Sequence, residues 1–202
     1  MIIESFINAV IQIILFSVIP FCWWFLVARK KCSFLTWLGL QKPDIKSKAN
    51  YWLCFLGVMA LLVIPICTIV YFFVDASLLA FERFAGLGLA AIIPGLIYAI
   101  FQTGFSEELF FRGFLAKRLI VRFGFHKGNL LQSLLFGAIH GLMFLSLVEL
   151  IAVAFIFITT ALAGYLMGWM NEKVSKGSIV TSWAIHSSAN FLAAVLIMFN
   201  FV

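Results

Sequence analysis

Charged side chains are scarce in this sequence. Only 11% of the 202 residues are Asp, Glu, Lys or Arg, whereas 64% are hydrophobic. A soluble domain has roughly 45–50% apolar residues, so the composition excludes water as the main solvent of the folded chain. A bilayer span needs about 20 mostly apolar residues, and runs of that length recur along the sequence. We therefore expect an integral membrane protein.

Two further classes of protein lack their usual signatures. The four cysteines show no Cys-x-x-Cys pair and no nearby histidine, so neither a disulfide framework nor a zinc knuckle is indicated. The formal net charge is +6, yet the basic residues lie between apolar runs instead of forming one stripe. Nucleic acid is therefore not an expected partner.

The apolar runs predict an all-α, polytopic transmembrane bundle of six to seven spans. By length and apolarity we expect helices over residues 2–27, 51–74, 87 to a point between 104 and 115, 130–147, 150–169 and 179–199. No internal repeat or soluble domain interrupts them. The chain is expected to form one membrane domain over residues 1–202, with two N-terminal spans in 1–86 and the other spans in 87–202.

Positive charge predicts the orientation. Cytoplasmic connections of membrane proteins carry an excess of Lys and Arg. Basic residues gather here in three connections, at 29–48, 117–127 and 173–176, while the opposite connections hold Asp75, Glu82, Arg83 and Glu149. Six spans with both termini outside and the basic connections in the cytoplasm fit this pattern. Small size and positive charge are compatible with a bacterial plasma membrane.

The ionisable residues within the spans are few and fall into groups. An ionisable residue at membrane depth costs several kcal/mol and is by default a candidate for function. The groups are Glu107, Glu108 and Arg112; Phe136 and His140; His186 and Asn190. Because residues i and i+4 share a helix face, each group presents its members in one direction. A rise of about 1.5 Å per residue puts Glu107, His140 and His186 at similar depths, ~15–18 Å from the basic connections.

The third span leaves two local structures open. Its apolar run continues through Gln102, Glu107, Glu108 and Arg112 before the basic cluster. One long tilted helix can carry these residues. Alternatively the helix breaks at Gly104 and restarts with a serine N-cap, which places both carboxylates in a favourable first turn.

These residue types suit hydrolysis of an acyl bond. Glu108 and Arg112 form the natural i,i+4 ion pair, which leaves Glu107 free. An apolar surround disfavours the charged form of a carboxylate and suits it to general acid and base work. Together with His140, Glu107 is expected to polarise a water molecule.

His186 and Asn190 offer N–H donors on one helix face. Such a pair can stabilise the oxyanion of a tetrahedral intermediate. Taken singly, either residue is more typical of helix packing, so the interpretation depends on their joint occurrence.

The three motifs, in this order on consecutive membrane helices, resemble those of the CPBP family, which comprises type II CaaX prenyl endopeptidases and bacteriocin-processing or immunity (Abi) proteins. The resemblance covers roughly residues 104–199. It implies an intramembrane protease in which Glu107 and His140 activate water, His186 and Asn190 hold the oxyanion, and Glu108 and Arg112 support them. The implied partner is a membrane peptide or protein, such as a prenylated tail or a bacteriocin leader.

Three alternatives stay open. A Glu/His/His set can bind zinc, but the His-Glu-x-x-His signature is absent and we favour a metal-free mechanism without a cofactor. The same residues would also serve a non-proteolytic scaffold or bacteriocin-immunity protein. A small proton-coupled transporter is the third reading, although the repeated halves common in transporters are missing. The sequence does not indicate an oligomeric state.

Overall fold

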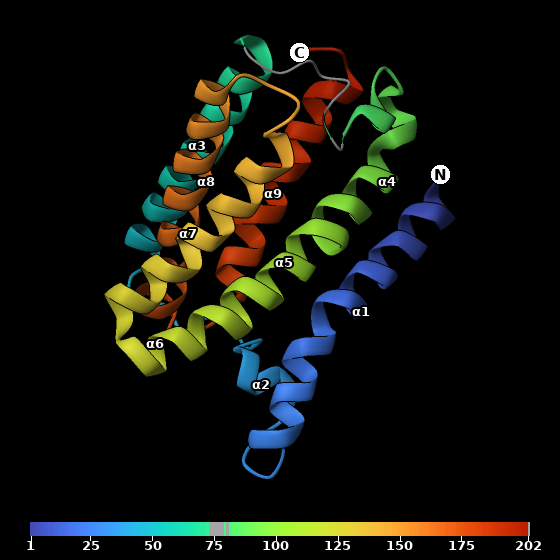
Figure 1. The fold of residues 1–202 in the computed structure, drawn as a ribbon. Helices are drawn as coiled ribbons and strands as arrows, with labels where there is room; N and C mark the ends of the chain where they lie inside the picture. The colour runs from blue at the N-terminus through green and yellow to red at the C-terminus, as the bar shows by residue number, and fades with distance from the viewer. Residues whose placement is uncertain (73–78, 80, 202) are drawn as a thin grey trace.

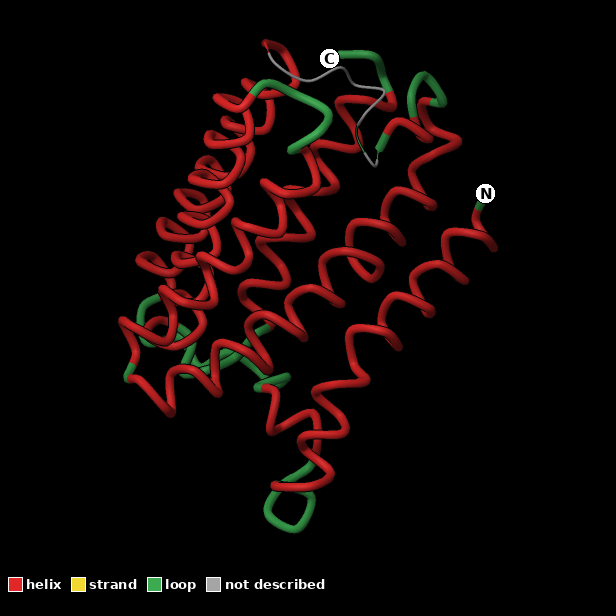
Figure 2. The backbone as a smooth tube through the Cα atoms, viewed as in Figure 1, coloured by secondary structure: helices red, strands yellow, loops and turns green. Residues whose placement is uncertain are grey.

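The computed structural model describes residues 1–72, 79 and 81–201, and within these residues the chain is helical without strands (Figure 2). The all-α expectation is confirmed. The α-helices are α1 (Ile2–Val27), α2 (Phe34–Leu38), α3 (Lys48–Phe72), α4 (Ile92–Ile97), α5 (Ser106–Glu108), α6 (Lys117–Phe123), α7 (Phe125–Phe144), α8 (Leu150–Trp169) and α9 (Val180–Met198). The 3-10 turns are η2 (Glu82–Phe84) and η3 (Gly88–Ala91), and the π-helical segments are η4 (Tyr98–Phe105), η5 (Leu109–Ala116) and η6 (Met170–Val174).

Five helical segments among the described residues are long and apolar enough to cross a membrane. They are Ile2–Val27, Lys48–Pro65, Gly88–Phe123, Leu150–Val174 and Val180–Met198. The first matches the expected span at both ends, while the expected end of the second at residue 74 lies outside the described residues. The span expected over 130–147 is present as α7, which is not among the five. Helix α7 begins at Phe125 and so takes in His126, Lys127 and Asn129, which lower its mean hydropathy.

The third span is a single long helix whose winding changes along its length. Segments η4 and η5 are π-helical and flank the short α5. Ser106 has helical backbone angles and is therefore not an N-cap, so the helix does not break at Gly104. The Thr103 hydroxyl donates to the Tyr98 carbonyl five residues earlier. π-Helical turns inside α-helices are frequent at functional sites.

The three basic connections meet at one end of the bundle. Lys117 Nζ bonds Glu172 Oε1 at 2.9 Å and the Gly177 carbonyl at 2.7 Å. The Ile179 amide donates to the Gly39 carbonyl at 2.9 Å, which fixes the connection after α1 to the start of α9. Both chain termini lie toward the other end (Figure 1).

The less basic connections lie at the end where the termini are found. Residues Glu82 and Arg83 form part of η2, and Glu149 immediately precedes α8. The Gly86 amide donates to the Ile197 carbonyl at 3.3 Å, which joins this end to the last turn of α9. Asp75, expected in the same region, lies outside the described residues.

Glycines let α7 and α8 pack closely side by side (Figure 1). A Cβ atom on Gly137 of α7 would lie 2.6 Å from the Phe157 carbonyl oxygen. In the other direction, a Cβ atom on Gly168 of α8 would lie 2.0 Å from Asn129 Oδ1. Small residues at helix interfaces allow such close backbone approach in membranes. The Gly164-x-x-x-Gly168 pattern therefore acts as a close-packing motif.

Candidate active site

The Glu108 and Arg112 side chains form the buried base of the site. Arg112 Nη1 donates to Glu108 Oε1 at 2.7 Å, and the two side chains are 1% and 0% exposed. The guanidinium also stacks over the Phe136 ring, 4.2 Å from its centroid. A buried charge is tolerated only when it is paired. The i,i+4 pairing is as the sequence predicted, and the Arg112–Phe136 contact links this helix to α7.

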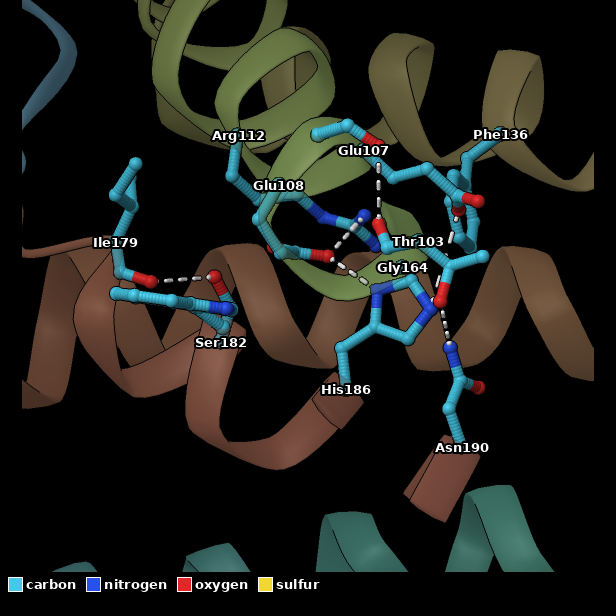
Figure 3. Close-up of polar contacts among 12 residues, drawn as sticks. Thr103, Glu107, Glu108, Arg112, Phe136, Gly164, Ile179, Ser182, His186 and Asn190 are labelled. Atoms are coloured by element: carbon cyan, nitrogen blue, oxygen red, sulfur yellow. Dashed lines mark hydrogen bonds and ion pairs between the residues drawn. The ribbon is translucent and has the colours of Figure 1, made fainter. Parts of the chain in front are cut away.

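The same carboxylate oxygen bonds an imidazole of α9. His186 Nδ1 lies 2.9 Å from Glu108 Oε1, and Figure 3 shows this contact beside the ion pair. The imidazole is mostly buried, with 8% of the side chain exposed. Glu108 is therefore shared between Arg112 on its own helix and His186 on another helix, a role that its position in the sequence did not reveal.

The Glu107 carboxylate faces the imidazoles of both His140 and His186. Its Oε2 atom lies 3.9 Å from His140 Nε2 and 3.9 Å from His186 Nε2. Within the described residues this buried oxygen has no hydrogen-bond partner. A separation above 3.5 Å between polar atoms is the kind that an intervening water bridges. Glu107 Oε2 is therefore free to accept a hydrogen bond from a ligand in this space.

Hydrogen bonds on the far sides of the rings fix the tautomers. His140 Nδ1 lies 2.8 Å from the Phe136 carbonyl oxygen, which can only accept. His186 Nδ1 faces the Glu108 carboxylate in the same way. We therefore assign the proton of each neutral ring to Nδ1, which makes each Nε2 an acceptor. Both rings turn a basic nitrogen toward Glu107.

Asn190 is oriented by a residue that the sequence analysis missed. Its Nδ2 donates to Thr103 Oγ1 at 2.8 Å, and Thr103 in turn donates to the Tyr98 carbonyl at 3.2 Å. A primary amide has two N–H donors, so one remains for a ligand. Thr103 lies four residues before Glu107, and this i,i+4 spacing was the available signal.

A cavity of about 900 Å³ opens onto these groups. Its polar lining includes Thr103, Glu107, His140, His186 and Asn190. Apolar side chains from several helices make up most of the rest, among them Leu15 and Phe16 of α1, Leu61 and Leu62 of α3, Met143 of α7, Ile156 of α8 and Leu196 of α9. The predicted site residues that touch this space come from three separate segments of the chain. The cavity is large and mostly apolar.

Glu107, His140 and His186 have the residue types of a zinc site. Tetrahedral zinc with bonds of about 2.0–2.1 Å places ligand atoms about 3.3 Å apart. The Glu107 oxygen lies 3.9 Å from each imidazole nitrogen, which is wider. Among residues 1–72, 79 and 81–201, no group of three His, Cys, Asp or Glu side chains is arranged to hold a metal ion.

Comparison with known proteins identifies the family. No curated protein and no solved structure matches the chain. The family model described as type II CAAX prenyl endopeptidase Rce1-like matches residues 89–192, just over half of the chain. The matched segment contains all three motifs, from Glu107 to Asn190, and the long apolar helices suit a membrane protein. The chain therefore belongs to the Rce1-like family of type II CAAX prenyl endopeptidases, which are membrane proteases.

Proposed function

We propose that this protein hydrolyses a peptide bond inside the membrane with a water molecule held by Glu107 and His140. The observation that carries the proposal is the position of Glu107 Oε2, at 3.9 Å from the Nε2 atoms of both imidazoles. A water molecule can donate two hydrogen bonds, one to Glu107 Oε2 and one to Nε2 of neutral His140. Burial in an apolar cavity strengthens each of these interactions.

The proposed reaction begins with attack by this water on the peptide carbonyl carbon. Its proton passes to Glu107 or to Nε2 of His140, and the carbonyl becomes a tetrahedral oxyanion. The C–N bond then breaks, and the stored proton goes to the leaving amine. The products are a carboxylic acid and an amine, so no oxidant or reductant is needed. A general base of this kind typically accelerates a reaction about 10²–10⁴-fold.

Asn190 and His186 are the proposed oxyanion donors. The second N–H of Asn190 is available, because Thr103 takes only the first. His186 can donate from Nε2 only when the ring is doubly protonated, since Nδ1 already carries a proton. The Glu108 carboxylate at 2.9 Å would stabilise that imidazolium. The proposed oxyanion role of His186 therefore requires a doubly protonated ring.

The proposed substrate is a membrane-proximal peptide with an apolar attachment. The mostly apolar cavity of about 900 Å³ suits an isoprenoid chain, and the family description supports a prenylated CaaX peptide. A bacteriocin leader is the other peptide that we consider. The basic end of the bundle is proposed to face the cytoplasm, with both termini outside.

Turnover by purified variants in liposomes tests the proposal. With a farnesylated peptide ending in a CaaX sequence, or a bacteriocin leader peptide, Glu107→Gln should reduce turnover by at least ~10²–10³-fold. A matched control is Glu82→Gln, which changes an exposed glutamate of η2 outside the cavity. Normal turnover by Glu107→Gln would refute the mechanism. Loss of turnover on addition of a chelator, followed by recovery on addition of zinc, would also refute it. Protection against a peptide toxin that survives Glu107→Gln would instead support a non-proteolytic immunity protein.

A further inference from the structure

Carboxamide side chains border a shallow, open groove beside the catalytic cavity. Asn8 and Gln12 of α1 and Gln102 of η4 border this groove, together with the apolar Ile11, Leu15 and Phe16. With a rise of about 1.5 Å per residue, Asn8 and Gln12 lie ~9 and ~15 Å inside the start of α1. They are therefore amides at membrane depth on a helix that is otherwise mainly apolar.

The groove and the catalytic cavity share part of their walls. Gln12, Leu15 and Phe16 line both spaces. Gln12 Nε2 donates to Ser106 Oγ at 3.3 Å, and Ser106 directly precedes Glu107. A chain lying in the groove would therefore reach the proposed water position by passing Gln12.

These amides keep hydrogen-bonding capacity that the described residues do not use. Among the described residues, the Asn8 side chain forms no hydrogen bond, and Gln12 uses only its side-chain amide nitrogen. Gln102 Oε1 accepts from Arg83 Nη2 at 3.2 Å, which leaves its amide nitrogen as a donor. An unsatisfied amide in an apolar surround costs roughly 1–3 kcal/mol. Their free donors and acceptors are available to a ligand in the groove.

The chemistry of the groove matches a peptide main chain. An extended peptide inside a bilayer has N–H and C=O groups that need partners, because lipid supplies none. A carboxamide offers both a donor and an acceptor, whereas an acyl or isoprenoid chain can use neither. We propose that the groove between α1 and η4 binds the main chain of the substrate peptide in extended form, with Gln12 as the contact nearest the cleaved bond. This inference rests on the proposed function and adds a binding site to it.

Binding to an inactive enzyme tests the site without requiring turnover. In the Glu107→Gln background, the affinity of full-length protein in liposomes for a farnesylated CaaX peptide would be measured for Gln12→Leu and Asn8→Leu. Each substitution should weaken binding about three- to tenfold, the usual effect of one or two lost hydrogen bonds. Both make α1 more apolar, which favours membrane insertion. Ser17→Leu is the matched control, since Ser17 is on α1 but lines neither space.

Photo-crosslinking supplies a second readout. A peptide with a photoreactive group on the residue next to the cleaved bond should label α1 near residue 12 and η4 near residue 102. Labelling of α7 or α8 alone, or unchanged affinity in both the Gln12 and Asn8 variants, would overturn the groove assignment. If wild type cleaves the peptide while these results are negative, only the groove inference fails. If Gln12→Leu weakens binding but wild type does not cleave, the groove stands and the protease proposal fails.

Discussion

The last helices and the first helices of this protein are packed very differently. In the most apolar window of each segment, 50% of the residues of Val180–Met198 and 39% of those of Leu150–Val174 are buried, against 6% for Ile2–Val27 and 11% for Lys48–Pro65. All four are long and apolar, so hydropathy does not separate them. The candidate residues His186 and Asn190 thus lie on a closely packed helix, in what we call the inner half, while α1 and α3 form a largely exposed outer half.

The physical cause lies in what each half offers its neighbours. Lipid tails are as apolar as Leu, so apolar helices gain little by leaving lipid for one another. The inner helices are joined by buried polar pairs and by glycine contacts. Helix α1, by contrast, packs along the third span through partly exposed side chains. Examples are Gln12, which contacts Ser106, and Phe16, whose ring centroid lies 5.9 Å from that of Phe110 in an edge-to-face pair. We therefore expect mutations to be costly in the inner half and mild in the outer half.

The largest effect is expected at Arg112. Replacing it by Leu leaves the Glu108 carboxylate buried without its cation, which should cost about 3–5 kcal/mol of unfolding free energy and abolish turnover. Thermal unfolding in detergent measures the loss. The double variant Glu108→Gln with Arg112→Leu removes both charges and should recover part of the stability. Equal stability of Arg112→Leu and wild type would show that the ion pair does not hold the inner half together.

A smaller loss is expected from closing the gap between α7 and α8. In Gly137→Ala, the added Cβ would lie 2.6 Å from the Phe157 carbonyl oxygen and 2.7 Å from the Ala161 Cβ. Because backbone atoms must move, we expect about 1–3 kcal/mol of destabilisation and a fall in turnover as His140 shifts with α7. Chemical denaturation and initial rates on one preparation test both parts. A variant with wild-type stability and rate would contradict the close packing of the two helices.

A still smaller effect is expected at Thr103, which positions Asn190. Thr103→Val keeps the shape but removes the hydroxyl that accepts from Asn190 Nδ2 at 2.8 Å. We expect kcat to fall about five- to tenfold with little change in KM, because the loss concerns the transition state. Thr103→Ser should restore most of the rate. If Ser and Val are equally slow, the hydroxyl is not what orients the amide.

The smallest effect belongs to the outer half. Among the described residues, no atom would lie within 4 Å of a Cβ atom on Gly57 of α3. Gly57→Ala should therefore be neutral or stabilising by up to about 1 kcal/mol through helix propensity, with unchanged turnover. Set beside Gly137→Ala, it compares the same substitution in the two halves. A loss as large as that at Gly137 would mean that α3 is packed as closely as the inner helices.

The apolar composition of the runs predicted the helix positions, and the spacing of the polar residues predicted that the three motifs lie close together. Long apolar runs identify α1, α8 and α9 almost to the residue, and the i,i+4 pattern predicted the pairing of Glu108 with Arg112, at 2.7 Å in the structure. The start of α7 was predicted five residues too late. Asn129 is polar and was assigned to a connection, because the sequence does not reveal its buried partners on α8. The catalytic roles of Glu107, His140, His186 and Asn190 stay predictions.

Tertiary contacts determine the features that the sequence could not supply. The π-helical winding of η4 and η5 depends on hydrogen bonds that no hydrophobic pattern encodes. The tautomer of His140 follows from the nearby Phe136 carbonyl, and that of His186 from a carboxylate 78 residues earlier in the chain. The role of Thr103 likewise requires the contact between η4 and α9.

The sharing of Glu108 Oε1 between Arg112 and His186 has a consequence for biogenesis. The Glu108 carboxylate that directs the proton on the His186 ring belongs to another helix, so this tautomer is set only after α9 has packed against that helix. In a chain that is still being inserted into the bilayer, His186 would not yet have this hydrogen bond. Packing of α9 would then also complete the proposed active site.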